Sequence, residues 1–248
     1  MKVSIITATN NSQKTVEDCI KSIREQEYQN IEHIIIDNKS TDSTLNIINR
    51  NKKNNNFIKL ISEFDNGIYD ALNKGINHAS GDIIGFLHSD DIFYNCHTIF
   101  DIVSFLKKNK YDGVYGNLQY VKKNNTNKVV RFWKSSKFDQ NLLKKGWMPP
   151  HPTLFLRKYV YDKHGKFNDF FQISADYDFI LRVFKDQELT LGYFPSVITR
   201  MRVGGVSNRS FKNIIKKSVE DYNAIKNNNI GNFKTLIGKN ISKVKQFF

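Results

Sequence analysis

The sequence predicts an α/β protein built on a mainly parallel β-sheet. Four short runs rich in β-branched residues lie in the first third of the chain, at residues 3–7, 31–36, 57–61 and 83–87. The segments between the first of these runs carry apolar residues at helical spacing, namely Val16, Cys19, Ile20 and Ile23, and then Leu45 and Ile48. Strands that are apolar throughout and alternate with helices are typical of parallel sheets with both faces covered. Such sheets bind ligands beyond the carboxyl ends of their strands.

The second half of the chain predicts a hairpin, a proline-rich loop, two helices and two closing strands. The hairpin is expected at residues 113–133 and the proline-rich loop at 149–152. The two helices are expected at 157–163 and from 176 onwards, and the two strands at 190–194 and 197–201. The first helix should end at Gly165, because glycine commonly follows the last helical residue. The second helix should bury a face formed by Phe179, Ile180, Val183 and Phe184.

The composition limits the class of protein and of partner. The chain has 248 residues, with 38 lysines and arginines against 24 acidic residues, so its formal net charge is +14. This charge predicts an anionic partner, whether nucleic acid, a membrane surface or a phosphorylated small molecule. AT-rich coding DNA would also produce such an Asn-, Lys- and Ile-rich chain. Two cysteines cannot build a disulfide framework, and no signal peptide or 18-residue apolar run is found, so we expect a cytoplasmic protein.

Residues 207–248 are predicted to form a basic amphipathic segment that follows the main domain at residues 1–206. From Arg209 onwards the chain holds nine basic and two acidic side chains, which is half of the total net charge. Apolar residues recur there at helical spacing between lysines: Ile214, Ile215, Val219, Tyr222 and Ile225. The segment is either an amphipathic helix packed on the domain with a solvated lysine face, or a peripheral attachment to an anionic bilayer.

The usual phosphate-binding loops are absent from the sequence. The first predicted strand continues into Ala8-Thr9-Asn10-Asn11 without a glycine-rich fingerprint, and no P-loop motif occurs. The sequence therefore disfavours dinucleotide-dependent oxidoreductases and P-loop enzymes.

Acidic residues instead follow two of the predicted strands. Asp37 follows the second apolar run, and the pair Asp90-Asp91 follows the fourth. A carboxylate at the end of a buried strand needs a cation, a hydrogen-bond donor or solvent. Paired carboxylates suit a hard divalent cation, which commonly bridges a protein and a diphosphate. The alternative is that Ser89, Asp90 and Asp91 cap the helix expected near residue 97.

A further candidate region spans residues 65–75. Asn66-Gly67 is a turn signal, and the helix expected after it would carry one polar face formed by Asp70, Asn73, Lys74 and Asn77. This face, with its lysine opposite the strand ends, could hold a nucleotide diphosphate. The alternative is a merely solvated face.

Four segments in this order closely resemble the motifs of family 2 glycosyltransferases. They are SIITATN at 4–10, IIDNKSTDST at 35–44, DNGIYDALNKG at 65–75 and GDIIGFLHSDD at 81–91. The resemblance is to bacterial enzymes that assemble O-antigen, capsule and colanic-acid-type polysaccharides. It implies a GT-A fold, which is a Rossmann-like sheet with a nucleotide-sugar-binding half at residues 1–116 and a smaller acceptor half at 117–206.

The resemblance also implies a donor site drawn from all four segments. Its nucleotide-sugar-binding residues would be Thr7, Ala8, Thr9, Asp37, Asp65, Lys74 and Asp90. Within this set, residues 7–9 lie along the base and ribose, Asp37 contacts the uracil, and Asp90 lies towards the ribose and sugar. Asp91 is the implied ligand of Mn²⁺ or Mg²⁺, with Ser89 in place of a frequent first acid of this motif.

The implied catalytic base lies at the start of a helix in the acceptor half. Asp176 aligns with that base, although Ala175 replaces the glutamate that usually precedes it. Asp178 is the alternative base, and otherwise a first-turn acid favoured by the helix dipole. His151 would touch the donor diphosphate or the acceptor, unless it is a structural histidine. Residues 204–207 resemble a loop that closes over the donor, or form a plain turn.

The resemblance therefore implies a metal-dependent inverting glycosyltransferase. It would move a sugar from a UDP-sugar to a saccharide or an undecaprenyl-diphosphate-linked acceptor, at the inner face of the cytoplasmic membrane. A sugar-1-phosphate nucleotidyltransferase is disfavoured, because such enzymes open with a glycine-rich loop and residues 8–13 contain no glycine. A nucleic-acid-binding module is disfavoured because the charge concentrates in the last forty residues. We expect no nucleic-acid partner.

Overall fold

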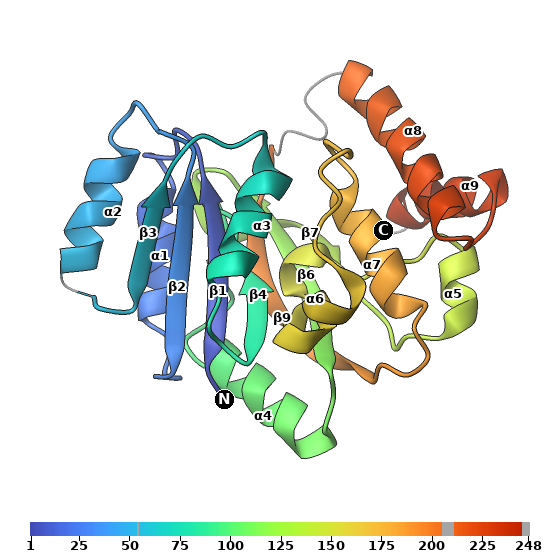
Figure 1. Cartoon of the computed structure of the whole chain (residues 1–248), viewed down its shortest axis with the longest axis horizontal. Coiled ribbons are helices and arrows are strands. Elements are labelled where there is room, and N and C mark those ends of the chain that lie inside the picture. The colour runs from blue at the N-terminus through green and yellow to red at the C-terminus, as the bar shows by residue number, and fades with distance from the viewer. Residues whose placement is uncertain (54, 205–210, 245–248) are drawn as a thin grey trace.

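The computed structural model describes residues 1–53, 55–204 and 211–244 and shows a β-sheet with helices on both faces (Figure 1). Among these residues, nine strands run in the order β3-β2-β1-β4-β8-β6-β9-β5, with β7 paired to β6. The strands are β1 (Val3–Thr9), β2 (Ile31–Asp37), β3 (Ile58–Ser62), β4 (Ile83–Phe86), β5 (Ile92–Phe93), β6 (Gly113–Lys122), β7 (Asn125–Trp133), β8 (Phe155–Arg157) and β9 (Leu191–Arg202).

The sheet is parallel in its first half and mixed in its second. β1 pairs in parallel with β2 and β4, and β2 pairs in parallel with β3. β8 is antiparallel to both β4 and β6, so it joins the two halves of the sheet. Beyond it, β6 and β9 are parallel, while β7 is antiparallel to β6. The predicted α/β class, its four parallel strands and the hairpin are confirmed.

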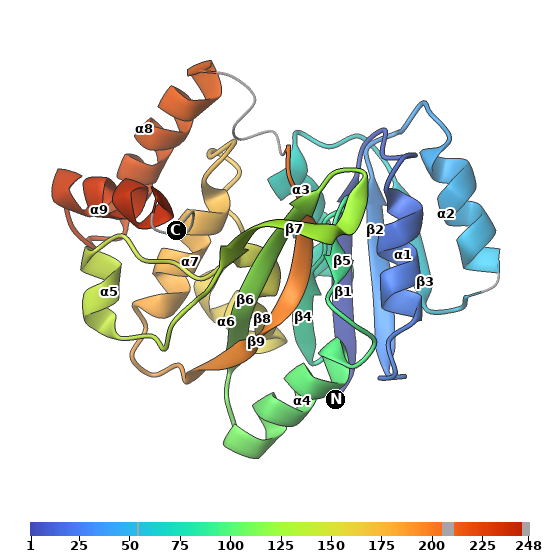
Figure 2. The same ribbon diagram turned by 180° about the vertical axis from the view of Figure 1, so that it is seen from behind.

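Helices form a layer on each face of the sheet. Their bounds are α1 (Val16–Arg24), α2 (Thr44–Lys53), α3 (Ile68–His78), α4 (Thr98–Asn109), α5 (Gln140–Lys144), α6 (Lys158–His164), α7 (Ala175–Phe184), α8 (Phe211–Asn227) and α9 (Phe233–Val244). α3, α6 and α7 cover the face seen in Figure 1, and α1, α2 and α4 cover the face seen in Figure 2. Neighbouring residues of β1 therefore pack into different cores, Ile6 with α3 and Ile5 with α4.

Two details of the second half differ from the prediction. The two closing strands predicted at 190–194 and 197–201 are one continuous strand, β9. The pairing of β6 with β9 shifts register between Tyr115 and Leu118, opposite Pro195-Ser196. This irregularity is a β-bulge, which accommodates the proline without ending the strand. The proline-rich loop contains a 3₁₀ turn at His151–Thr153. α6 ends before Gly165 (φ 73°), and the four predicted core residues of α7 are buried, both as expected.

The C-terminal segment packs beside α7 and α5 (Figures 1 and 2). Ala224 and Ile225 of α8 are fully buried in the same core as α7. Lys239 of α9 is buried as well; its ammonium group lies 2.6 Å from Asp221 Oδ1 and 3.2 Å from the centre of the Tyr177 ring. The predicted helix is confirmed, with one face against the domain. No described helix is long and apolar enough to cross a membrane.

The predicted domain limits stay predictions. The division at residue 116 falls inside β6, and the limit at 206 lies outside the described residues. Residues 205–207 of the predicted donor-closing loop also lie outside them.

Candidate active site

The carboxyl ends of β1 and β2 meet at Asp37, which is fully buried. Its Oδ1 accepts hydrogen bonds from Thr9 Oγ1 (3.0 Å) and Ser40 Oγ (2.5 Å). Its Oδ2 accepts bonds from Ser40 N (3.0 Å) and Ser62 Oγ (2.9 Å). A buried carboxylate needs such donors, so Asp37 fixes the three strand ends that border the predicted nucleoside site.

Thr7 and Thr9 take different roles on β1. Thr7 is fully buried, and its hydroxyl donates to the carbonyl of Leu87 (2.7 Å) and lies 2.9 Å from His33 Nε2. Thr9 instead contacts Asp37. Ala8 lies between them, partly exposed on the opposite face of the strand. The structure thus brings Thr9 and Asp37 together and turns the side chain of Thr7 into the core.

The loop before α3 contains Asp65 and contacts Lys74. Asp65 Oδ1 accepts the backbone N–H of Gly67 (2.9 Å), whose φ of 124° suits glycine. Burial raises the pKa of Asp65. Lys74 Nζ lies 3.1 Å from Glu63 and 3.4 Å from Asp70, so its charge is already paired. The polar face of α3 is therefore bonded to its surroundings rather than merely solvated.

Asp91 is a buried acid with one oxygen that lacks a hydrogen-bond partner among the described residues. It is fully buried, and its Oδ1 accepts the backbone N–H of Arg202 at 3.2 Å. Its Oδ2 is buried without a hydrogen-bond partner among the described residues. Burial, followed by the charge of Asp90, holds the pKa of Asp91 well above its usual range. An orphaned buried carboxylate oxygen beside a second acid fits a divalent cation, so these residues suit the predicted Mn²⁺ or Mg²⁺.

The alternative that residues 89–91 cap a helix is not what the structure shows. α4 begins at Thr98 with His97 as its N-cap residue, and the side chain just before it is that of Asn95, whose Oδ1 accepts from His97 N (3.0 Å) and from Thr98 Oγ1 (3.2 Å). Asp90 and Asp91 lie at the end of β4, where Asp91 N donates to the carbonyl of His88 (2.9 Å).

Two imidazoles, the partly exposed His88 and the buried His151, lie within electrostatic reach of Asp176. The rings of His88 and His151 are 6.3 Å apart. Burial lowers the pKa of His151 to about 4 and also lowers the pKa of His88, against the opposing charges of Asp90 and Asp176. His151 is therefore neutral at pH 7, and the lowered pKa of His88 favours its neutral form as well. His151 also packs against Phe86 and Phe167, as a structural histidine would.

Asp176 and Asp178 face different surroundings on the first turn of α7. Asp176 is partly exposed, and its Oδ1 lies 3.2 Å from the hydroxyl of Tyr69 and accepts Tyr177 N at 2.8 Å. Asp178 is buried, and its two oxygens bind Arg182 Nε (3.0 Å) and Asn228 Nδ2 (2.8 Å). Asp178 thus ties α7 to the end of α8, whereas Asp176 has the exposure and the neighbours expected of a base.

The segment before α7 is held by Glu220 of α8. The carboxylate of Glu220 accepts three backbone N–H groups, from Gln172 (3.2 Å), Ile173 (2.8 Å) and Ser174 (3.0 Å). It is 8% exposed. A carboxylate is favourable at a helix N-terminus because the unpaired N–H groups and the helix dipole are positive there. The C-terminal segment therefore supports the position of Asp176.

A polar hollow of about 330 Å³ adjoins Arg202 on the side of α1 and the β6–β7 turn. It is lined by Lys14, Asp18, Lys123, Asn124, Asn125, Thr126 and Arg202. Its three cations exceed its single acid, so the hollow favours an anionic group close to Asp91.

The sequence alone did not predict a role for Tyr69, Glu220 or Arg202. Each acts on a residue at least 46 positions away: Tyr69 on Asp176, Glu220 on Ser174, and Arg202 on Asp91. Tyr69 lies inside the 65–75 segment that resembles a family motif, and nothing else in the sequence indicated a role for it. Nothing local distinguishes Glu220 from other helical acids.

Fold and site together define an α/β enzyme with acidic side chains at the carboxyl edge of a parallel sheet. A family model, "Glycosyl transferase family 2", matches residues 4–165. The chain belongs to this glycosyltransferase family. It is 31% identical over 208 residues to a "PGL/p-HBAD biosynthesis glycosyltransferase" of Mycobacterium tuberculosis, covering 83% of this chain and 78% of that one. An uncharacterized glycosyltransferase of Haemophilus influenzae is 28% identical over 254 residues, 98% of this chain and 77% of that one.

Solved structures share the fold. S. aureus TarS 1–349 in complex with UDP-GlcNAc matches with a TM-score of 0.69 at 18% identity, over 91% of this chain and 66% of that chain. The mannosyltransferase PcManGT from Pyrobaculum calidifontis, in complex with GDP-Man and Mn²⁺, matches with a TM-score of 0.66 at 20% identity, over 91% and 64%. This chain spans about two thirds of the length of these structures. The predicted GT-A fold is confirmed.

Proposed function

We propose that this glycosyltransferase moves a sugar from a UDP-sugar to a hydroxyl group of a saccharide or lipid-linked saccharide, with inversion at the anomeric carbon. One observation carries the proposal: two acids suited to different tasks lie near one histidine, since the charges of Asp90, next to Asp91, and of Asp176 both act on His88. Asp91 keeps a buried oxygen without a partner among the described residues, as a cation ligand would. Asp176, a partly exposed acid oriented by Tyr69, has the features of a general base.

In the proposed reaction, Asp176 accepts the proton of the acceptor hydroxyl as that oxygen attacks the anomeric carbon. The attack comes from the face opposite the diphosphate, so the old carbon–oxygen bond breaks as the new one forms and the configuration inverts. A single displacement needs one base and no covalent nucleophile. Asp91 would hold Mn²⁺ or Mg²⁺, which when bound neutralises charge on the departing diphosphate.

The donor is proposed to be a UDP-sugar held at the carboxyl ends of β1, β2 and β4. The residues proposed for its nucleotide-sugar are Thr7, Ala8, Thr9, Asp37, Asp65, Lys74 and Asp90, with His151 towards the diphosphate or acceptor. Thr7 would contribute through its backbone, because its side chain lies in the core. The UDP-GlcNAc complex of TarS supports a uridine nucleotide, and the GDP-Man complex of PcManGT supports the use of a metal.

Nucleotide release from a panel of UDP-, GDP- and dTDP-sugars tests donor and metal together. The full chain with Mn²⁺ should release UDP selectively, and EDTA or Asp91→Ala should abolish release with the fold intact by circular dichroism. Asp162→Ala, which removes an exposed acid of α6, is the control and should keep full activity. Selective release of GDP or dTDP would overturn the donor, and full activity in EDTA would overturn the metal.

We place the acceptor at the cytoplasmic membrane, as an undecaprenyl-diphosphate-linked saccharide of a surface polysaccharide such as O-antigen or capsule. The support is the outer face of α8. Ile215 and Val219, four positions apart on one face of α8, are 52% and 54% exposed, and the adjacent Ile214 is 49% exposed although it shares a face with buried Ile225. Exposed lysines border this apolar face, Lys212 and Lys226 among them. An exposed apolar stripe between cations suits an anionic bilayer.

Co-sedimentation with vesicles tests this attachment by point substitution, since removal of α8 would also remove Glu220. The double variant Ile215→Asp with Val219→Asp should lose binding to phosphatidylglycerol vesicles at low salt and keep its nucleotide release. Val130→Asp is the matched control, because Val130 is 45% exposed on β7. Binding of the unaltered chain should fall with salt, because salt screens the lysines. An unaltered chain that ignores anionic vesicles would overturn the attachment.

A further inference from the structure

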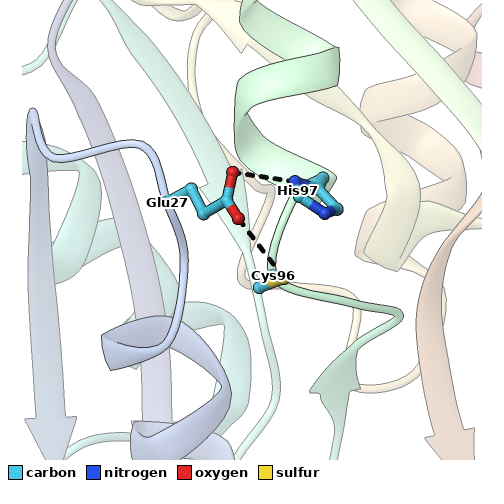
Figure 3. Close-up of side chains that lie close together, drawn as sticks. All are labelled: Glu27, Cys96 and His97. Atoms are coloured by element: carbon cyan, nitrogen blue, oxygen red, sulfur yellow. Dashed lines mark hydrogen bonds and ion pairs between the residues drawn. The ribbon is translucent and has the colours of Figure 1, made fainter.

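Three side chains of metal-ligating types that the proposed active site does not use lie close together (Figure 3), one of them in the connection that leads to the amino end of β2. Glu27 lies between α1 and β2, and Cys96 and His97 directly precede α4. Glu27 Oε2 lies 2.8 Å from His97 Nδ1, and Glu27 Oε1 lies 3.9 Å from Cys96 Sγ. The three ligand atoms all lie within 4.8 Å of one another.

The backbone holds these two segments together independently of the three side chains. Glu27 N donates to the carbonyl of Cys96 at 2.9 Å. The side chain of Gln26, which is 5% exposed, donates to the carbonyl of Asn95 (2.8 Å) and accepts the N–H of Ile99 (3.0 Å). The segments are some seventy residues apart in sequence, so their proximity is a property of the fold. The backbone that carries Glu27, Cys96 and His97 is therefore held in place by these hydrogen bonds, as a metal site requires.

We propose that Glu27, Cys96 and His97 bind a divalent transition-metal ion of the zinc type. Sulfur, nitrogen and oxygen ligands together suit Zn²⁺, which takes three protein ligands and a water in a tetrahedral site. Metal–ligand distances of about 2.0–2.3 Å place the ligand atoms of such a site about 3–4 Å apart. Side-chain rotation alone would bring the three ligand atoms to this spacing, and the half-exposed side chains of Glu27 and His97 have room to rotate. Cys96 binds as the thiolate and gives its proton to solvent.

The proposed ion is distinct from the one proposed for the donor. Mn²⁺ and Mg²⁺ favour oxygen ligands, as at Asp91, whereas a thiolate and an imidazole select softer ions. Bound between Glu27 and the start of α4, the ion would clip the α1–β2 connection to the helix layer on that face. The effect is structural, because the site lies at the sheet edge opposite Asp37 and Asp91.

Zinc binding to the full chain tests the proposal without reference to activity. Metal-free protein in excess Mg²⁺ competes for Zn²⁺ with a chromophoric chelator. The unaltered chain should bind one Zn²⁺, and Cys96→Ser or His97→Asn should weaken binding at least about tenfold. His78→Asn, which removes an exposed histidine elsewhere, is the control and should bind as the unaltered chain does. Equal affinity in the unaltered chain and in Cys96→Ser would overturn the site.

Thiol modification gives a second readout. Cys19 is fully buried, so a thiol reagent added to the folded chain reports on the partly exposed Cys96. Zn²⁺ should slow this modification in the unaltered chain, because a bound thiolate is no longer free to react. Glu27→Gln keeps both thiols and should lose most of the protection. A modification rate that Zn²⁺ does not change would overturn the proposal even if Cys96→Ser failed to fold.

Discussion

Tyr69 holds the carboxylate of Asp176 from the neighbouring helix. Its hydroxyl lies 3.2 Å from Asp176 Oδ1 and 2.7 Å from the carbonyl oxygen of Ile173, so its single proton has two acceptors on one segment. Burial, followed by the charge of Asp176, raises the pKa of Tyr69 well above its usual range. Tyr69 therefore remains a hydrogen-bond donor across the pH range of an enzyme, and we propose that it positions Asp176, the proposed base.

Tyr69→Phe should lower kcat about tenfold and leave the donor KM unchanged, because a hydrogen bond to a charged group contributes about 1.5–3 kcal/mol and both acceptors of the Tyr69 hydroxyl lie on the segment of Asp176. Steady-state kinetics with the accepted donor measure this split. Tyr161→Phe is the matched control, since the buried Tyr161 hydroxyl has no hydrogen-bond partner among the described residues. Equal kcat in both variants would show that Tyr69 does not position Asp176.

At the scale of elements, α8 is both part of the core and part of the site. Ile225 packs with α7, while Glu220 accepts the N–H groups of residues 172–174. The same helix exposes Ile215 and Val219 on its other side. α8 therefore connects the proposed membrane contact to the segment that precedes Asp176, the proposed base.

Glu220→Gln should lower the free energy of unfolding by about 1.5–3 kcal/mol, because it replaces charge-assisted bonds with neutral ones at a helix N-terminus. Denaturant unfolding measures the change, and kcat should fall with it. Glu188→Gln is the control: Glu188 is 83% exposed, so its loss should change stability by less than about 0.5 kcal/mol. Stability of Glu220→Gln equal to that of Glu188→Gln would contradict the supporting role of α8.

The sequence predicted elements well where a local pattern determines them. The apolar runs gave β1 to β4, and Gly165 marked the end of α6. The break predicted near Pro195 was wrong, because the bulge that absorbs this proline depends on the partner strand β6. Periodicity revealed α8 as amphipathic but not which side packs, since the partner residues of α7 lie some fifty positions earlier in the chain.

At the scale of the whole molecule, the site joins residues from the first strand to the C-terminal helices. Strand ends and the resemblance together predicted Asp37, Asp91 and Asp176, because their segments carry recognisable motifs. Tyr69 and Arg202 were not predicted, since they act across 107 and 111 positions and only the folded sheet and helix layer bring the partners together. The roles of the predicted residues in donor, metal and proton transfer remain predictions.

Comparison of Asp176→Asn with Asp178→Asn tests the central claim most directly. Asparagine keeps the shape of aspartate but cannot accept the proton, so Asp176→Asn should lower kcat about 10²–10⁴-fold and leave the donor Kd nearly unchanged. Asp178→Asn should mainly lower stability, because Asp178 ties Arg182 to Asn228 in the core. Donor binding by calorimetry and single-turnover transfer measure the two quantities. Loss of transfer in Asp178→Asn, with Asp176→Asn still active, would contradict the assignment of the base.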